Sequence, residues 1–201
     1  MIDNFVKKFS KEVRFVSSID IHTTHLIVND EKQTLRSPLS LKFLQAVANN
    51  CFCLSYNWIL ECLRYDRIID GDGHEIEGVN TNNSIIGGPK RSRLAEKRHS
   101  LFEEYCFIVK STENNEAKLS NQCIKDLLTS CGGKIIDSVT PNLLKSSKIL
   151  VICDRSYVIE QRSNVESCRS VGVGFVPLFW LVESILDYNP RKIQSYQENL
   201  F

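Results

Sequence analysis

The sequence predicts an α/β fold made of two copies of one small domain, each with a small parallel sheet flanked by helices. The main observation is a repeated segment that contains both tryptophans, CFCLSYNWILECLRYDRII at 51–69 and GFVPLFWLVESILDYNPRKI at 174–193. Each tryptophan, Trp58 or Trp180, lies four residues after the end of an apolar strand. Repeats of this length usually indicate duplicated domains rather than solenoid units.

Two further observations support the duplication. An apolar strand ending in aspartate precedes each repeated segment, THLIVND at 24–30 and KILVICD at 148–154. Strands and helices also alternate along both halves, and strands joined through helices run parallel. The 201 residues have room for two domains of about 90 to 100 residues.

The first half is expected to begin with a helix and two strands. Residues 3–12 carry Phe5 and Phe9 among lysines, which suits an amphipathic helix. The run VRFVSS, from Val13, predicts a strand, and residues 26–28 predict a second one.

The next three elements end with the first tryptophan helix. In SPLSLKFLQAVANN (37–50), apolar residues recur at helical spacing, and the closing pair of asparagines would stop the helix. CFCL (51–54) then predicts a strand, and Ser55 predicts the N-cap of a helix over 56–65.

The second half is expected to follow a linker. Residues 70–88 are rich in Gly, Asn and Asp, which is typical of a loop. The second copy begins near Phe102 and has the predicted order β-α-β-β-α-β-α. Gly132-Gly133 predict a left-handed cap on its first helix, and Pro177 is expected in the first turn of its last helix. The predicted elements are a strand at 105–109, a helix at 116–130, strands at 134–139 and 148–153, a short helix within 155–170, a strand at 174–176 and the second tryptophan helix.

Composition argues against several classes of protein. The 25 Lys and Arg against 24 Asp and Glu give a net charge of +1, whereas a strongly basic nucleic-acid-binding domain would be more lopsided. The eight cysteines show no C-x-x-C spacing, so we expect reduced thiols of an intracellular protein and no metal site. No apolar run approaches the ~20 residues that span a membrane, and the N-terminus is too polar for a signal peptide. Because no catalytic motif is present, we expect binding rather than catalysis and no cofactor.

These features resemble the BRCT domain, a phosphoprotein-binding module of DNA-damage proteins. The family's two hallmarks are the tryptophan of the last helix and a Gly-Gly pair after the first helix; the second copy has both, and the first has Trp58 alone. The linker GPKRSRLAEKRHSLFEEYCFIV (88–109) is similar to that of the branch formed by the breast-cancer-susceptibility protein and its RING-domain partner, and most similar to the RING-partner (BARD) type. The resemblance implies two tandem BRCT domains packed together through helices, with repeat 1 at 1–69, a linker at 70–101 and repeat 2 at 102–201.

One departure from the family concerns the first strand. In the family this strand precedes the amphipathic helix and ends in a Ser/Thr-Gly pair that grips phosphate, but no strand and no Ser-Gly precede Phe5 here. Either the sequence is truncated or the first repeat is incomplete. A sheet without that central strand is expected to be weaker, because its neighbours lose their ladder partners. Phosphate binding is less favoured for the same reason.

The resemblance also implies contacts with a phosphopeptide. Lys42 matches the phosphate-contacting lysine, whose ammonium pairs with phosphate as a point charge; the alternative is a solvated helix lysine. Leu44, Leu119 and Val182 match the lining of a groove between the repeats for an aromatic residue beyond the phosphoserine; the alternative is an inter-repeat core. Leu39 replaces an arginine of the susceptibility protein, which favours the RING-partner branch. Both tryptophans are expected to be structural anchors.

A basic run is the other candidate site. It could contact DNA phosphate, poly(ADP-ribose) or the acidic face of a nucleosome, and it resembles a nuclear-localisation stretch. The alternative is a solvated linker whose arginines pair with Glu103 and Glu104 or cap helices. The run consists of Lys90, Arg91, Arg93, Lys97 and Arg98.

The resemblance implies a nuclear, non-enzymatic module of a RING-type ubiquitin-ligase subunit in DNA double-strand-break repair. It would recruit the complex to damaged chromatin by binding a phosphopeptide, a nucleosome or poly(ADP-ribose), with a heterodimer partner held through a RING domain outside this chain. Two alternatives are a phosphate-independent protein-protein scaffold and direct DNA binding through the basic linker. A steep loss of affinity with added salt would support DNA binding.

Overall fold

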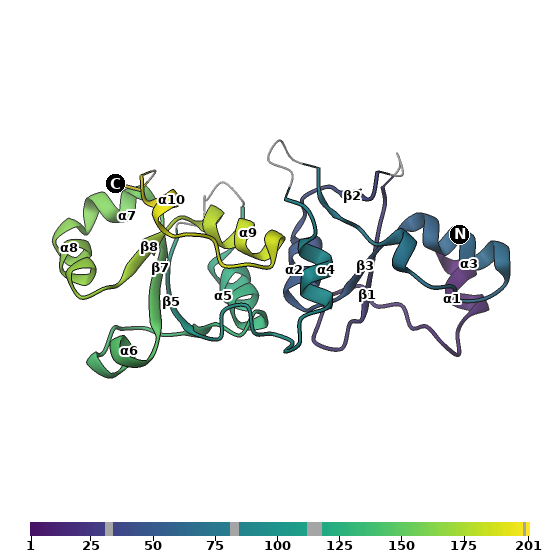
Figure 1. Ribbon diagram of the computed structural model, residues 1–201, viewed down its shortest axis with the longest axis horizontal. Coiled ribbons are helices and arrows are strands. Elements are labelled where there is room, and N and C mark those ends of the chain that lie inside the picture. The colour runs from purple at the N-terminus through teal and green to yellow at the C-terminus, as the bar shows by residue number, and fades with distance from the viewer. Residues whose placement is uncertain (31–33, 81–84, 112–117, 199) are drawn as a thin grey trace. The chain divides into compact units, whose positions relative to one another are not determined.

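The structure is a computed structural model that describes residues 1–30, 34–80, 85–111, 118–198 and 200–201 (Figure 1). The chain divides into two compact units, residues 1–98 and 99–201. Each unit has parallel strands, helices between them and a closing tryptophan helix, which confirms the predicted duplicated α/β fold. The described residues between 70 and 98, which are most of the linker expected at 70–101, belong to the first unit.

The first unit contains two small parallel sheets, in which β1 pairs with β3 and β2 pairs with β4. Ser55 is the N-cap that the sequence predicts, since its hydroxyl accepts the Asn57 N–H, and the Ser40 hydroxyl caps another helix by accepting the Phe43 N–H. The helix expected at 3–12 ends at Lys8, and the segment expected to be a linker contains a helix, Gly88–Arg93. The elements are α1 (Ile2–Lys8), β1 (His25–Val28), β2 (Arg36–Ser37), α2 (Leu41–Ala48), β3 (Phe52–Ser55), α3 (Tyr56–Tyr65), a 3-10 helix (Asp72–His74), β4 (Gly78–Val79) and α4 (Gly88–Arg93).

The second unit has one parallel sheet with the strand order β6-β5-β7-β8. The elements are β5 (Tyr105–Lys110), α5 (Asn121–Ser130), β6 (Lys134–Ile135), α6 (Pro141–Ser146), β7 (Lys148–Cys153), α7 (Arg155–Glu160), α8 (Arg162–Ser170), β8 (Gly174–Val176), α9 (Leu178–Asp187) and α10 (Gln194–Gln197).

Four predictions for the second unit were wrong in detail. Residues 118–120, expected within the helix at 116–130, are not helical, and α5 begins at Asn121 after its cap Ser120. The strand expected at 134–139 ends at Ile135, and after four further residues Thr140 caps a helix that was not predicted, α6, with Pro141 in its first turn. Residues 155–170 form two helices, α7 and α8, rather than one. Pro177 is the extended N-cap of α9 rather than a residue of its first turn.

The strand predicted from Val13 was also wrong, since VRFVSS has no strand conformation. This run follows α1 as β6 follows α5, and β6 pairs only with β5 in the described part of the chain. The described residues of the first unit include no counterpart of β5. Without a ladder partner, the backbone groups of VRFVSS gain nothing from an extended pairing geometry.

The strand ladders shift the predicted match between the two copies by one residue. The tryptophan helices align Leu54 with Val176, and these two residues pair with Ile27 and Ile152. Ile27 therefore corresponds to Ile152, whereas the match of THLIVND with KILVICD placed it on Val151.

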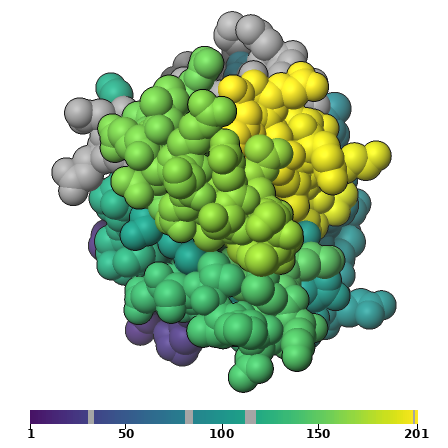
Figure 2. Space-filling view, turned by 90° about the vertical axis from the view of Figure 1, so that its left-hand side faces the viewer, coloured from purple at the N-terminus to yellow at the C-terminus, as the bar shows by residue number. Residues whose placement is uncertain are grey.

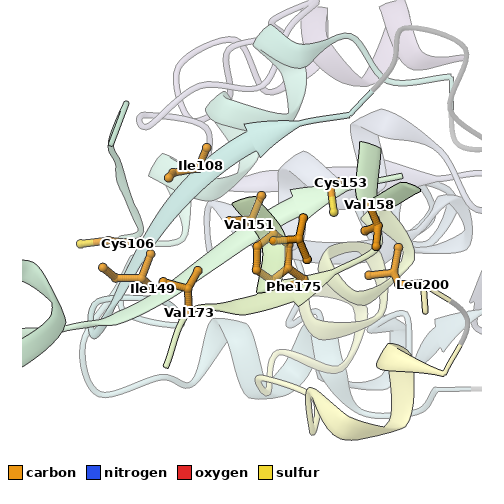
Figure 3. Close-up of a cluster of buried hydrophobic side chains, with 10 residues drawn as sticks. Cys106, Ile108, Ile149, Val151, Cys153, Val158, Val173, Phe175 and Leu200 are labelled. Atoms are coloured by element: carbon orange, nitrogen blue, oxygen red, sulfur yellow. The ribbon is translucent and has the colours of Figure 1, made fainter. Parts of the chain in front are cut away.

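Each unit has its own apolar core. In the first unit, Phe5 and Phe9 of α1 and the segment after it pack with Leu54 and Trp58. In the second unit, side chains from β5, β7 and β8 pack with Val158 and with Leu200 near the C-terminus (Figure 3). Figure 2 shows the C-terminal residues, in yellow, beside the green helices of this unit. The last turns of the chain therefore contribute to its core.

A clasp of two hydrogen bonds follows each tryptophan helix. In the first unit, the indole N–H of Trp58 donates to the Ile69 carbonyl over 3.0 Å, and the Ile69 N–H donates to the Cys62 sulfur over 3.5 Å. Between helix and clasp, the chain passes through a left-handed residue, Asp66. In the second unit, the indole N–H of Trp180 donates to the Arg191 carbonyl over 2.9 Å, and the Arg191 N–H donates to the Ser184 hydroxyl over 3.1 Å. The left-handed residue there is Tyr188.

Candidate functional site

Lys42 lies in the first turn of α2 with its side chain exposed. The helix is held in place by a buried face that includes Phe43 and Leu44. Ser40 caps one of the first N–H groups, and the remaining ones give this end of the helix a partial positive charge. A lysine beside a helix N-terminus can bind an anion through both charge and hydrogen bonds.

The three predicted groove residues are all buried: Leu44, Leu119 and Val182. Leu44 belongs to the first unit, and the other two belong to the second. The groove that they would share stays a prediction.

A serine–aspartate pair that sequence reasoning missed lies at the carboxyl end of the strands in each unit. In the first unit, the Ser55 hydroxyl donates to the buried Asp30 carboxylate, which also accepts the Leu35 N–H over 3.1 Å. In the second unit, the Ser111 hydroxyl donates to Asp154 over 3.3 Å. The aspartates after the two strands were visible in the sequence, but their serine partners were not. Because Asp154 places a carboxylate beside Ser111, the end of β5 is a poor place for phosphate.

The basic run does not act as one surface. Arg93 binds both carboxylate oxygens of the buried Glu75 at 2.8 and 2.9 Å, and its guanidinium lies 4.1 Å from the centre of the Phe52 ring. The hydrogen bond to Glu75 raises the pKa of Arg93. Arg98 donates to the Asn49 carbonyl over 3.0 Å. Two of the five cations therefore hold the first unit together.

The other three cations are exposed, as is Arg98. Lys90 and Arg91 line a shallow hollow on α4 together with Gly87 and Leu94, and Lys97 follows this helix. The predicted pairing of linker arginines with Glu104 is not observed, since that carboxylate binds Lys148 at 2.7 Å.

Replacing Arg93 with methionine should destabilise the first unit by about 2 kcal/mol. Breaking a buried ion pair costs about 3–5 kcal/mol, and we expect less here because the Arg93 side chain is 22% exposed. Urea denaturation would measure the loss. The control is Lys90→Met on the same helix, which should change stability by less than about 0.5 kcal/mol. Equal losses in both variants would contradict the structural role of Arg93.

In the described part of the chain, the side chains that could bind a metal ion are not gathered into a site. The described residues contain no group of three or more His, Cys, Asp or Glu side chains that could hold a metal ion. Burial raises the pKa of Cys51 to about 11 and that of Cys153 to about 12, so these thiols stay protonated at neutral pH and are poor nucleophiles. Among the described helices, none has the length and apolar character needed to cross a membrane.

Comparison with known sequences gives relatives that include two homologs of the breast cancer type 1 susceptibility protein. No family model matches the chain. The breast cancer type 1 susceptibility protein homolog of Caenorhabditis elegans is 25% identical over 206 residues, covering 98% of this chain and 33% of that protein. The homolog of Mus musculus is 22% identical, covering 95% of this chain and 10% of that protein. The chain thus spans between a tenth and a third of the length of these relatives.

Comparison with solved structures identifies the fold. The BRCT5-BRCT6 domains of S. pombe Brc1 match with a TM-score of 0.69 at 16% identity, covering 98% of this chain and 92% of that one. Rtt107p in complex with a phosphorylated histone matches with a TM-score of 0.63 at 14% identity, covering 99% of this chain and 86% of that one. The chain has two α/β units, each with parallel strands and a closing tryptophan helix, and these define it as a tandem-repeat module. Its fold is that of tandem BRCT domains, and in sequence it is similar to the BRCT region of the BRCA1 homologues.

Proposed function

We propose that this chain is a non-catalytic module that binds phosphorylated protein in the DNA-damage response. The observation that carries the proposal is the exposed Lys42 in the first turn of α2, within a tandem BRCT fold. The Rtt107p structure of this fold contains a phosphorylated histone, which supports a phosphoprotein ligand.

The chemistry of α2 suits a phosphoserine. A phosphate carries about −1.5 to −2 charge at pH 7 and three strong acceptor oxygens. The Lys42 ammonium offers an opposite charge, and the first turn of α2 offers N–H donors that have no partner within the helix. Leu44, Leu119 and Val182 would receive an apolar residue of the same peptide beyond the phosphoserine.

We place this module in a nuclear RING-type ubiquitin-ligase complex that is recruited to damaged chromatin. The relatives named as BRCA1 homologues support this placement, as does the linker sequence GPKRSRL. The chain covers at most a third of these relatives, so the RING domain and its heterodimer partner would lie outside it. Leu39 and the linker are the sequence features that favour the RING-partner branch, whereas the relatives named above are homologs of the susceptibility protein.

The test is fluorescence-polarisation binding of a pSer-x-x-Phe peptide library and its unphosphorylated counterparts. We expect binding that depends on the phosphate and that weakens by about tenfold or more in Lys42→Ala, equivalent to about 1.4 kcal/mol. The matched control is Lys145→Ala, an exposed helix lysine of the second unit, which should bind as the parent does. Binding that ignores the phosphate, or equal affinity in both variants, would refute the phosphopeptide site.

A second candidate ligand is a polyanion at the basic run. The exposed Lys90, Arg91 and Lys97 favour it, because they gather on and just after α4. Binding of a nucleosome, poly(ADP-ribose) or DNA there would weaken steeply with added salt and would not respond to Lys42→Ala. For a scaffold that binds an unmodified protein, affinity would neither fall steeply with added salt nor respond to Lys42→Ala.

A further inference from the structure

One side of α4 is fixed to the first unit, and the other side is open to solvent. On the fixed side, the fully buried Ser92 accepts the Asn50 side-chain amide at its carbonyl over 2.8 Å and at its hydroxyl over 3.1 Å. The next residue, Arg93, makes the two-oxygen ion pair with the buried Glu75. These contacts hold α4 in one position.

The hollow described above lies on the open side of α4. Its lining residues Gly87, Lys90, Arg91 and Leu94 recur at helical spacing and therefore share one face. Its volume is about 430 Å³, which lies within the range of about 300–1,000 Å³ for small ligand sites. α4 packs beside α2, whereas α1 packs beside α3 on the other side of β1 and β3 (Figure 1). The hollow therefore belongs to the α2 side of the first unit.

Gly87 shapes one wall of the hollow. It has a φ of +82°, a conformation that glycine adopts without strain. An added Cβ atom would lie 2.8 Å from Nη1 of Arg91, so the arginine side chain lies directly against the glycine backbone. The Gly87 N–H donates to the Glu77 carbonyl over 2.6 Å, which fixes the start of α4. A larger residue at this position would displace Arg91 and fill part of the hollow.

The hollow combines positive charge with exposed apolar surface. Lys90 is exposed, and residues 85–98 contain five cations against one acid, Glu96. The side chain of Leu94, the last lining residue, is 60% exposed, and Ile86, directly before Gly87, is 51% exposed. Carboxylates would pair with the cations, and an aliphatic side chain would remove the apolar surface of Leu94 from water.

We propose that this hollow binds an acidic segment of a partner protein in which an apolar side chain lies between carboxylates. The inference rests on the second candidate ligand above, the polyanion, and names its chemistry; it does not depend on the Lys42 site. Nucleic acid fits less well, because its phosphates offer nothing to cover Leu94 and Ile86. Single strands are held largely by stacking on aromatic side chains, and residues 85–98 contain none. A helix already fixed in place loses little conformational entropy on binding.

Two labelled peptides test the proposal by fluorescence polarisation with the whole 201-residue chain. EDELLDEE has carboxylates on both sides of two leucines, and EDESSDEE keeps the charges but replaces the leucines with serines. We expect saturable binding of EDELLDEE, and an affinity about fivefold or more above that of EDESSDEE, because only the leucines can cover the apolar part of the hollow.

Two pairs of variants locate the bound peptide. Lys90→Glu should weaken binding of EDELLDEE by about tenfold or more, because it places a carboxylate against the carboxylates of the peptide. Its matched control is Lys145→Glu, at an exposed position of α6, which should leave the affinity unchanged. Leu94→Ser should remove the preference for EDELLDEE over EDESSDEE, whereas Ile159→Ser, at a position 68% exposed on α7, should keep that preference.

Three results would overturn the proposal: no saturable binding of EDELLDEE, equal affinity for the two peptides, or equal affinity in Lys90→Glu and Lys145→Glu. A short DNA duplex that binds more tightly than EDELLDEE and loses affinity in Lys90→Glu would assign the hollow to nucleic acid and overturn it as well. Loss of EDELLDEE binding in Lys42→Ala would place the peptide at α2, with the same consequence. The pSer-x-x-Phe peptides are measured on the same protein, so that failure of either binding activity is seen separately.

Discussion

Trp180→Ala should lower the free energy of unfolding of the second unit by about 3–5 kcal/mol, the range for truncating a large aromatic side chain in a core. The indole has no exposed surface, and its ring stacks on Phe102 at 5.5 Å. Truncation would open a cavity among the β5 aromatics. It would also remove the indole N–H that the Arg191 carbonyl accepts at 2.9 Å, leaving that carbonyl without its partner.

Urea denaturation followed by far-UV circular dichroism would measure this loss. In Trp180→Ala, fluorescence of the remaining Trp58 reports the first unit separately, and its transition should stay in place. Trp58→Ala is the matched comparison. It should cost about 2–4 kcal/mol in the first unit, because Trp58 is 6% exposed and has fewer aromatic neighbours. A larger loss at Trp58 than at Trp180 would contradict the difference in packing described above.

Gly132→Ala should destabilise the second unit by about 2–4 kcal/mol. Gly132 has a φ of +84°, a conformation that costs about 1 kcal/mol for alanine. A Cβ atom here would also lie 2.1 Å from the His99 carbonyl oxygen, and relieving such an overlap costs about 1–3 kcal/mol more. The predicted left-handed cap of α5 is thus also a point of close backbone approach.

The matched control for this substitution is Gly172→Ala. Gly172 has a φ of +93° but no atom within 4 Å of an added Cβ, so only the conformational cost of about 1 kcal/mol applies. Thermal and urea denaturation of the two variants would separate strain from overlap. Equal losses would show that the contact with His99 relaxes freely.

The sequence predicted elements best where local chemistry determines them. The helix over 56–65 matches α3 at both ends because Ser55 caps it and its apolar residues recur at helical spacing. Gly132 was predicted correctly as the cap of α5 for the same local reason. The strand predicted for VRFVSS is absent because strand conformation depends on a partner strand. The apolar residues of this run carry no information about whether that partner is present.

The residues of the candidate site also differ in whether neighbouring sequence or a distant partner determines their structure. Lys42 lies in α2, a helix that the sequence predicted from apolar residues at helical spacing within 37–50. The Arg93–Glu75 pair could not be predicted, because it joins residues 18 positions apart through the fold of a segment that looked like a linker. The basic run therefore looked like five equivalent cations in the sequence, although Arg93 and Arg98 have structural partners.

The clasp after each tryptophan helix shows what the two copies have kept since they diverged. The connecting residues differ completely, Asp-Arg-Ile at 66–68 and Tyr-Asn-Pro at 188–190, yet both stretches have three residues. Even the acceptor of the second hydrogen bond has changed, from the sulfur of Cys62 to the hydroxyl of Ser184. The identity of these residues differs between the copies, but their number does not. One inserted residue would move the N–H and C=O of the following residue away from both hydrogen-bond partners. The structural unit that the two copies share therefore extends through the clasp and does not stop at the end of the helix.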